Sequence, residues 1–244
     1  MIGVISDIHA NLAALQAVLG VLEARGVRRV ACLGDIVGYG PQPGECIRAL
    51  RSRAGMVAIL GNHDAAVLGT HGSAGFNGDA QAAVALNRRD LDPAGLSYLA
   101  ALPQQALLDD LALFHGSPSR PLTEYLRTPG AVGAALRAVD QRFLAVGHTH
   151  DPLLVGLDAA VALDIRQPEG AQAFALKPGS RYLINAGAVG QPRDGDPRAC
   201  LVLLDPAGQS VEFVRVAYDI EDTQRRMRAL GYPEALVVRL KAGR

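Results

Sequence analysis

Five short apolar stretches of this 244-residue chain are each followed at once by a cluster of polar residues. The clusters contain five of the six histidines and read Asp7-Ile8-His9, Gly34-Asp35, Gly61-Asn62-His63-Asp64, His115-Gly116 and Gly147-His148-Thr149-His150. The apolar stretches have the length and composition of buried strands. Because open α/β sheets place their binding groups just beyond the carboxyl ends of strands, we expect the polar side chains to converge. Such convergence requires, in this interpretation, that the five strands lie side by side in one sheet.

The first 150 residues alternate predicted strands and helices. Apolar runs predict strands, and apolar residues at helical spacing predict helices between them. The strands are expected at 2–5, 29–33, 56–60, 111–114 and 143–146, with 107–108 forming a hairpin with 111–114. Helices are expected at 12–22, around 46–50, across 65–101 with a glycine-rich break at 69–78, and at 131–139. The initial strand–helix–strand order implies parallel strands.

The pattern changes after His150. Short strands separated by Pro, Gly and Asp turns are expected at 153–155, 173–176, 182–184, 200–204 and 211–216, with no helix among them. We expect them to form a second sheet that packs on the first. A single domain, 1–244, is therefore predicted: a strand–helix half (1–150) that carries most of the polar clusters, second-sheet strands (151–218), and a C-terminal helix and tail (219–244).

Composition limits the cellular setting. Lysine plus arginine equals aspartate plus glutamate, so the net charge is zero and no nucleic-acid partner is expected. No apolar run approaches the roughly 20 residues that cross a bilayer, and the first residues do not read as a signal peptide. The three cysteines have no paired spacing, which fits a reducing compartment. We predict a cytoplasmic protein with no membrane association, and the oligomeric state stays open.

The polar clusters have the composition of a metal site. Asp7 and His9 are two residues apart, as are His148 and His150, and this spacing places both members of each pair on one face of an extended chain. Seven potential ligands exceed the needs of one ion. Two ions roughly 3.5–4 Å apart that share a carboxylate would use them all, and such a pair can hold a bridging hydroxide and bind a phosphate oxygen. Mixed nitrogen and oxygen donors suit two divalent ions (Mn, Fe, Co or Zn) better than Mg alone, and the absence of cysteine ligands argues against a structural zinc. Of these ions we favour Mn.

Each cluster also has a simpler explanation when taken by itself. The segment Gly34–Gly38 could be a turn, Asn62 or Asp64 could cap a helix, and the last cluster could be a polar strand end. The five clusters in this order, each at a predicted strand end, favour the metal site over these separate explanations.

Together the motifs D-x-H, G-D-x-x-G, G-N-H-D, H-G and G-H-T-H, over about residues 1–200, resemble the calcineurin-like metallophosphoesterase superfamily. The resemblance implies an α/β fold: a two-sheet β-sandwich flanked by helices, in four layers (αββα). It also implies two metal sites that share Asp35 as a bridge: Asp7, His9, Asp35 and His150 at one, and Asp35, Asn62, His115 and His148 at the other. In the same comparison His63 faces the substrate, as an acid or as a stabiliser of negative charge, and Asp64 orients its ring.

The resemblance implies a metal-dependent phosphoric ester hydrolase in which a metal-bridging hydroxide attacks a small phosphorylated substrate. At the second motif the chain has Tyr39 where protein phosphatases of the superfamily have a phosphate-binding arginine. That difference argues against a protein phosphatase and against relatives that cleave dinucleoside polyphosphates. The variant motif and the short chain resemble the small prokaryotic phosphodiesterase group. A phosphodiesterase is therefore the main hypothesis. A phosphomonoesterase acting on nucleotides or sugar phosphates is the second, and a non-catalytic metal-binding scaffold is the third.

Three residues are candidates for substrate binding. Asn62 is one of them. Arg193 ends a glycine-rich segment that begins at Asn185, and it would contact the substrate phosphate unless it is an ordinary surface arginine. Asn11 would either touch phosphate or cap the first helix. Substrate selectivity is expected in the loops 69–78 and 167–180, while the substrate itself and the native metal stay open.

Overall fold

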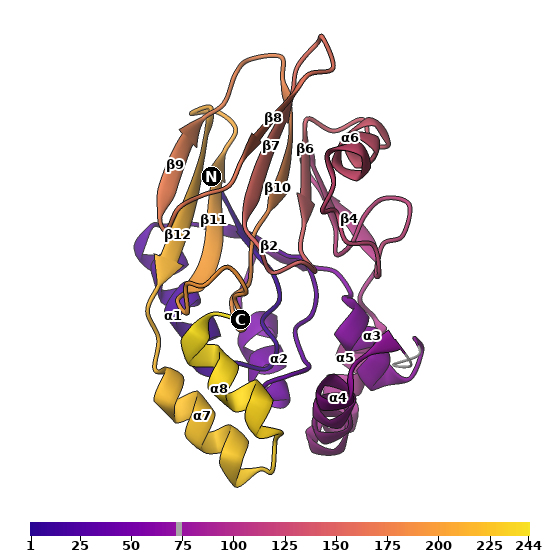
Figure 1. Cartoon of the computed structure of the whole chain (residues 1–244), viewed down its shortest axis with the longest axis vertical. Coiled ribbons are helices and arrows are strands. Elements are labelled where there is room, and N and C mark those ends of the chain that lie inside the picture. Colours follow the sequence, from indigo (N-terminus) through magenta and orange to yellow (C-terminus); the bar gives the residue numbers. More distant parts are fainter. Residues whose placement is uncertain (72–74) are drawn as a thin grey trace.

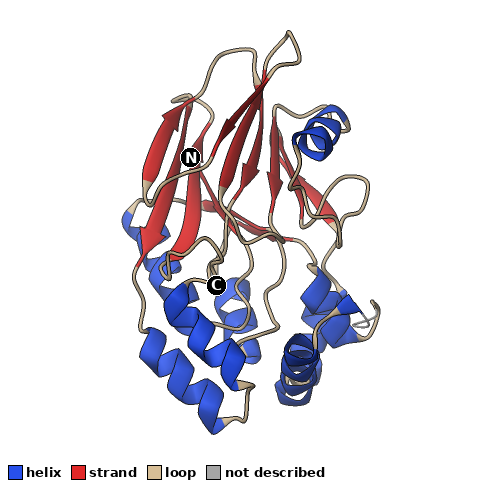
Figure 2. Cartoon of the chain, in the orientation of Figure 1, coloured by secondary structure: helices blue, strands red, loops and turns tan. Residues whose placement is uncertain are grey.

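Two six-stranded sheets face each other in the computed structural model, and helices cover their outer faces (Figures 1 and 2). The structure describes residues 1–71 and 75–244. The first sheet has the order β3 (Met56–Ala58), β2 (Arg29–Cys32), β1 (Ile2–Ile5), β11 (Ala199–Asp205), β12 (Ser210–Val216) and β9 (Gln172–Ala175). The second has the order β4 (Gln105–Leu108), β5 (Leu111–Phe114), β6 (Phe143–Val146), β10 (Arg181–Asn185), β7 (Leu153–Leu157) and β8 (Leu163–Arg166). The predicted α/β sandwich is confirmed.

Alternation along the strands builds the layers. Ile2 and Val4 of β1 lie in the apolar core between the two sheets, whereas Ile5 packs with the helices on the outside. Those helices are α1 (Leu12–Ala24) and α2 (Pro43–Arg51), and α6 (Pro129–Arg137) covers the outer face of the second sheet. Because both faces of each central strand are covered, these strands are almost continuously apolar in sequence. The layers are therefore helix, sheet, sheet and helix.

The strand pairing confirms the predicted parallel order. β1 pairs with β2, and β2 with β3, in parallel, and β4 and β5 form the expected antiparallel hairpin. In the second sheet β6 pairs in parallel with both β5 and β10. Parallel strands end at a common edge, so β1, β2 and β3 end together in one sheet, as do β5 and β6 in the other.

Two expectations about the sheets are wrong. The strands of 151–218 do not form one second sheet, because β9, β11 and β12 extend the first sheet while β7, β8 and β10 belong to the second. The five strands that precede the polar clusters are likewise divided between the two sheets rather than side by side in one. Apolar alternation reports that a strand is buried, but the partner of a strand depends on contacts far along the chain. β8 was missed because its polar residues, Asp164 and Arg166, weaken the apolar pattern.

In the described part of the chain, three helices connect β3 to β4. α3 (Asn62–Leu68), α4 (Gly78–Asp90) and α5 (Pro93–Ala100) follow β3, and Asp92 caps α5 as expected. No helix among the described residues is both long and apolar enough to cross a membrane.

The predicted single C-terminal helix and tail is wrong, because the segment forms two packed helices, α7 (Ile220–Ala229) and α8 (Glu234–Ala242). Gly231, with φ at +79°, follows the end of α7, and Pro233 precedes α8. Leu236, Val237 and Leu240 of α8 are buried in a cluster with Tyr39 and residues of α4 and α7. Burial of this apolar face explains why the presumed tail is helical and lies against the loop that contains Tyr39.

Candidate active site

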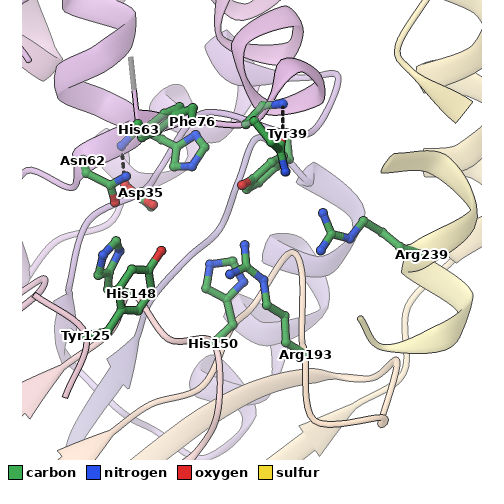
Figure 3. A pocket seen from close by; sticks show the side chains of 13 residues that line it. Asp35, Tyr39, Asn62, His63, Phe76, Tyr125, His148, His150, Arg193 and Arg239 are labelled. Atoms are coloured by element: carbon green, nitrogen blue, oxygen red, sulfur yellow. Dashed lines mark hydrogen bonds between the residues drawn. The ribbon is translucent and has the colours of Figure 1, made fainter. Parts of the chain in front are cut away.

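A cavity of about 290 Å³ lies where the loops after β2 and β6 meet α3 and α8 (Figure 3). It is lined in part by Asp35, His63, His148, His150, Arg193 and Arg239. In Figure 3 His148 and Tyr125 lie on one side of the cavity, and Arg193 and Arg239 lie on the other. All seven predicted metal ligands line this cavity or lie directly behind it, as their contacts show.

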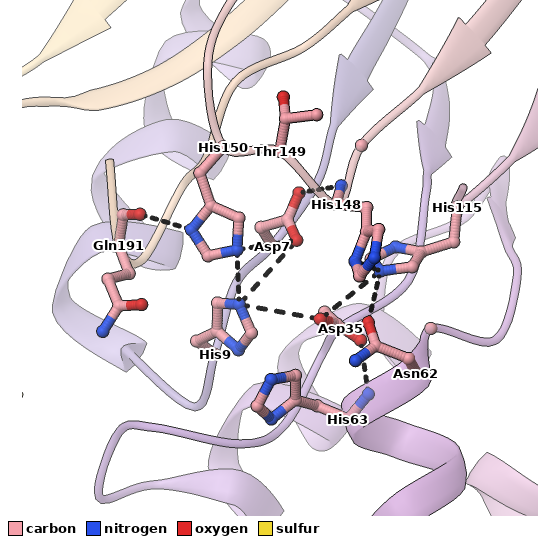
Figure 4. A network of polar contacts seen from close by, with 12 residues as sticks. Asp7, His9, Asp35, Asn62, His63, His115, His148, Thr149, His150 and Gln191 are labelled. Atoms are coloured by element: carbon pink, nitrogen blue, oxygen red, sulfur yellow. Dashed lines mark hydrogen bonds and ion pairs between the residues drawn. The ribbon is translucent and has the colours of Figure 1, made fainter. Parts of the chain in front are cut away.

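Asp7, His9 and His150 form the first ligand group (Figure 4). Nε2 of His150 lies 3.2 Å from Oδ1 of Asp7 and 3.1 Å from Nε2 of His9. Nε2 of His9 lies 3.7 Å from the same Asp7 oxygen. Three potential ligand atoms from two strand ends therefore point at one small volume, the arrangement that a single cation needs.

Asp35, His115 and His148 form the second ligand group. Nε2 of His115 lies 3.4 Å from Oδ2 of Asp35 and 3.2 Å from Nδ1 of His148. Oδ1 of Asn62 lies 2.8 Å from the same His115 nitrogen, so the asparagine adds a neutral oxygen to this group. The predicted second set of four side chains is thus brought together.

One carboxylate links the two groups. Oδ2 of Asp35 lies 3.4 Å from His115 in the second group and 3.7 Å from Nε2 of His9 in the first. The other oxygen, Oδ1, accepts a hydrogen bond from the backbone N–H of His63 at 2.8 Å. Asp35 therefore lies where a bridging ligand would have to lie.

Backbone carbonyls set the orientation of three imidazoles. Nδ1–H of His9 can donate to Val37, that of His115 to Leu33, and that of His150 to Gln191, at 3.2, 2.8 and 2.6 Å. A proton held on Nδ1 leaves the lone pair of Nε2 facing the ligand cluster. Metal-binding histidines are commonly fixed by an outer hydrogen bond of this kind.

The donor set fits divalent cations. Oδ1 of Asp7 and Oδ2 of Asp35 are buried without a hydrogen-bond partner among the described residues. Buried polar atoms are normally paired, so two orphaned carboxylate oxygens, one in each ligand group, call for a ligand. The facing Nε2 atoms of His9 and His150, each with its proton on the other nitrogen, would repel each other unless a cation lay between them.

The protonation states agree with this fit. Burial works to raise the pKa of Asp7 and Asp35, but the histidines around them outweigh it and hold both pKa values below the ordinary range. Burial lowers the pKa of His9 well below its ordinary value and that of His148 to about 3. Burial also works to lower the pKa of His115, but Asp35 outweighs it and raises that pKa to about 9. A cation would displace the His115 proton, as metals do when their ligands must be deprotonated.

The ligands occupy a strained backbone. Asp7, His9, Asp35, His148 and His150 all have φ between +49° and +66°, the left-handed region that non-glycine residues seldom adopt. Such conformations persist where the surrounding structure enforces them, and they concentrate at functional sites. At the His148–His150 turn, Nδ2 of Asn185 supplies part of that support by donating to Gly147 O and to Oγ1 of Thr149.

His63 faces the cavity, as the resemblance implies. Its ring stacks on Phe76 with centroids 4.4 Å apart, and lies 4.5 Å from the Tyr39 ring. Burial lowers the pKa of His63 to about 4, so the ring is neutral near pH 7. Nδ1 of the ring has no hydrogen-bond partner among the described residues. A neutral ring that lines the cavity is suited to hydrogen-bonding a ligand rather than to carrying charge.

The prediction that Asp64 orients His63 is wrong. Oδ1 of Asp64 accepts from the backbone N–H of Val37 and Oδ2 from that of Gly61, both at 3.0 Å. Adjacent side chains on a helix point about 100° apart, so Asp64 faces the protein interior while His63 faces the cavity. Asp64 instead ties the start of α3 to the loop after Asp35.

The prediction that Asn11 binds substrate is also wrong, and its alternative, a helix cap, is what the structure has. Oδ1 of Asn11 accepts from Ala14 N–H at the start of α1 and from Oγ1–H of Thr223, while Nδ2 donates to Gly190 O. Both ends of the buried amide are thus engaged within the protein. Asn62 and Arg193, the other two substrate-binding candidates, do line the cavity.

Of the two loops expected to determine substrate selectivity, one lines the cavity and the other does not. From the loop 69–78, Gly75, Phe76 and Asn77 line the cavity, whereas residues 72–74 lie outside the described part of the chain. The loop 167–180 contains β9 and contributes no described residue to this cavity.

Sequence reasoning also missed Tyr125 and Arg239 as cavity residues. Tyr125 stacks on His148 with centroids 3.9 Å apart, and Arg239 reaches the cavity from α8. Neither residue belongs to a motif. The one available signal was the basic, partly apolar character of the last segment.

The sequence matches the calcineurin-like phosphoesterase superfamily domain over residues 1–208. The uncharacterised protein MJ0912 of Methanocaldococcus jannaschii is 37% identical over 249 aligned positions, which cover 100% of this chain and 98% of that protein. Among solved structures, a metallophosphoesterase from Sphaerobacter thermophilus is 42% identical with a TM-score of 0.88, covering 100% of this chain and 99% of that one. The hypothetical protein PH1004 from Pyrococcus horikoshii OT3 shares the fold, with a TM-score of 0.81 at 23% identity and the same coverage.

These similarities agree with the arrangement of the cavity. The matched domain includes the six residues of the two ligand groups, and Asn62 and His63 beside them. Because that domain spans most of the chain, and a 37% identical relative matches it along its full length, this chain belongs to the calcineurin-like phosphoesterase superfamily.

Proposed function

We propose that the protein is a phosphodiesterase that hydrolyses a small phosphorylated substrate with two divalent cations, manganese by preference. The observation that carries the proposal is the position of Asp35 between two groups of buried ligand atoms that face one open cavity. Asp7, His9, Asp35 and His150 would hold one ion, and Asp35, Asn62, His115 and His148 the other. Bound there, the ions would lower the pKa of a water molecule and attract phosphoryl oxygens.

The protein's own residues would position the substrate around that centre. His63 would donate a hydrogen bond to a phosphoryl or leaving-group oxygen, a contact that gains strength as negative charge develops there. Its low pKa favours this neutral donor role over that of a cationic acid, unless the charge of a bound phosphate raises the pKa. Arg193, on the cavity wall beside His150, would contribute positive charge to substrate binding (Figure 3).

The cavity is lined on both sides of the ligand groups, as a diester would need. A phosphodiester carries a substituent on each side of phosphorus, and side chains line the cavity on both sides of the ligand cluster, with Tyr125 on one and Arg193 on the other (Figure 3). The scaffold hypothesis is less well supported, because protein contacts would not require His63 to line a cavity beside two groups of metal ligands.

A paired hydrolysis assay tests this proposal. Metal-stripped protein would be given Mn²⁺ and then an aryl phosphodiester or the matching monoester. Manganese-restored cleavage with a higher kcat/KM for the diester is expected. A preference for the monoester would replace the proposal with the phosphomonoesterase hypothesis. Failure to cleave either ester with two bound ions per chain would favour the scaffold.

A further inference from the structure

Two arginines lie near one aromatic ring at the edge of the cavity. The guanidinium carbons of Arg193 and Arg239 lie 5.9 and 5.8 Å from the centroid of the Tyr39 ring. Both side chains line the cavity that also contains Asp35 and His63, on the side next to His150 (Figure 3). Arg193 comes from the loop before β11 and Arg239 from α8, which lies beyond the matched domain. The fold thus brings two cationic side chains that are far apart in the sequence to one wall of the cavity.

Neither guanidinium forms an ion pair with a described carboxylate. Arg193 donates from Nη2 to Oε1 of Gln191 at 3.3 Å, and its Nε is buried without a described partner. Arg239 donates from Nε to the backbone oxygen of Arg244 at 2.6 Å. Burial lowers the pKa of Arg239, and the nearby charge of Arg193 lowers it further, with only partial compensation from Tyr39 and Asp79. Two partly buried cationic groups near each other repel, and an anion bound between them would relieve that repulsion.

Contacts next to the two arginines tie together the segments that carry them. Asp194, next to Arg193, is bound by the buried guanidinium of Arg215. Gly195 N–H donates to Gly243 O at the end of α8, at 3.0 Å, and so ties the Arg193 loop to the helix that carries Arg239. A binding group held in this way loses less freedom when its ligand arrives.

The Tyr39 ring beneath the pair is also fixed. Asn87 of α4 accepts from Gly38 N–H at 2.8 Å and donates to Gly40 O at 2.9 Å, so it clamps the backbone on both sides of Tyr39. Tyr232, which precedes α8, donates its hydroxyl to the same Gly40 oxygen. The loop, α4 and the C-terminal segment therefore form one support for the pair.

We propose that Arg193 and Arg239 form a second anion subsite, which binds an additional phosphate group of the substrate while the reacting phosphate lies at the metal ligands. This inference rests on the proposed function and narrows its substrate class to phosphoesters that carry a second phosphate. Phosphate is the favoured anion because each planar guanidinium presents paired N–H donors, and a phosphate has enough oxygens to accept from both.

Kinetics with a pair of substrates tests the subsite directly. The substrates would be an aryl phosphodiester and the same diester bearing a further phosphate on its alcohol, assayed with the manganese-loaded enzyme. Replacing a charged hydrogen-bonding group costs about 10- to 100-fold in affinity. Arg239→Gln should therefore lower the ratio of kcat/KM for the two-phosphate over the one-phosphate ester by about tenfold or more, mainly through KM. Arg225→Gln, which removes an equal charge from an exposed site on α7, should leave the ratio unchanged. An equal loss on both esters in Arg239→Gln would overturn the proposal.

Phosphate binding without turnover separates this inference from the proposed function. A calorimetric titration of the full-length, metal-stripped protein with inorganic phosphate measures the affinity of the arginine pair for phosphate, whether or not any ester is cleaved. Wild type and Arg225→Gln should bind equally, and Arg193→Gln and Arg239→Gln should each bind about tenfold more weakly. Absence of binding to wild type, or equal binding by all four proteins, would overturn the subsite. Comparable melting temperatures would exclude a folding defect as the cause.

Discussion

The carboxylate of Asp35 is the residue on which both ligand groups depend. It is almost fully buried, and its two oxygens have separate tasks: Oδ2 faces both groups and Oδ1 fixes the backbone of His63. A change of one atom in this side chain therefore affects the charge between the groups and the start of α3 at once.

We predict that Asp35→Asn reduces the bound manganese from two ions per chain to one or none. The amide keeps the size of the carboxylate but removes the shared negative charge. Loss of an outer hydrogen-bond partner already costs 10- to 100-fold in metal proteins, so the loss of a shared ligand should lower turnover by about 100-fold or more. Elemental analysis and kcat would be measured beside Asp140→Asn, an exposed control. Full metal content with full activity in Asp35→Asn would show that Asp35 is not a bridge.

His63→Ala should have the opposite profile. The ring faces the cavity but is not within either ligand group, so the metal content should stay at two while kcat falls by about 100- to 1,000-fold, the usual effect of removing one transition-state hydrogen bond. His71→Ala, at the one histidine outside the polar clusters, is the matched control. A variant that loses metal but turns over normally once reloaded would reverse the assigned role.

At its start, α3 packs so closely against Asp35 that almost no free space is left between them. A Cβ atom added at Gly61 would overlap Oδ1 and the backbone nitrogen of Asp35. Gly61 is also the N-cap of α3, and its N–H donates to Asp64. The helix can therefore bring Asn62 and His63 to the cavity only with glycine at this turn.

Gly61→Ala should displace Asp35 and weaken metal binding by tenfold or more, with a loss of about 1–3 kcal/mol in the free energy of unfolding, which is typical of overpacking. Gly20→Ala in α1 is the control, because no atom lies within 4 Å of its added Cβ. Manganese affinity and urea unfolding would be measured for both. Unchanged manganese affinity in Gly61→Ala would refute the close approach of α3 to Asp35.

Local pattern was sufficient to predict most elements and the pairing of strands close in sequence, but not the pairing of strands far apart in the chain. The apolar run at 2–5 and the Asp92-Pro93 start of α5 follow from burial and capping, which act over a few residues. The pairing of β11 with β1 joins residues about 200 positions apart, and nothing in either strand specifies the other. The ligands of the metal groups could be predicted because each lies in a short motif. Arg239 could not be predicted, because its position depends on the long-range packing of α8 against Tyr39.

For the molecule as a whole, buried cysteine thiols make the free energy of unfolding depend on pH in the alkaline range. Burial raises the pKa of Cys32 and of Cys200 to about 12, against an ordinary value of 9.0. The folded chain therefore keeps protons that the unfolded chain loses above about pH 9. The stability contributed by these groups is complete below that pH and is lost as pH rises toward 12.

We expect the free energy of unfolding to fall between pH 9 and pH 11 by about 1.4 kcal/mol per pH unit for each such thiol, once the unfolded thiol is ionised. Urea unfolding with a reductant present would measure this at pH 8, 9, 10 and 11. Cys200→Ala should be less stable at pH 8 because it leaves a cavity, yet lose less stability between pH 9 and 11 than the wild type. Equal pH slopes for the two proteins would mean that the thiol titrates normally in the fold.

The claim that two cations together create the active centre is tested most directly by titrating metal-stripped protein with Mn²⁺, while bound metal and the hydrolysis of an aryl phosphodiester are followed in the same samples. The arrangement of Asp35 between the two ligand groups predicts that hydrolysis rises with the second equivalent and saturates at two ions per chain. Full hydrolysis at one equivalent, or without added metal, would contradict a centre built from two ions.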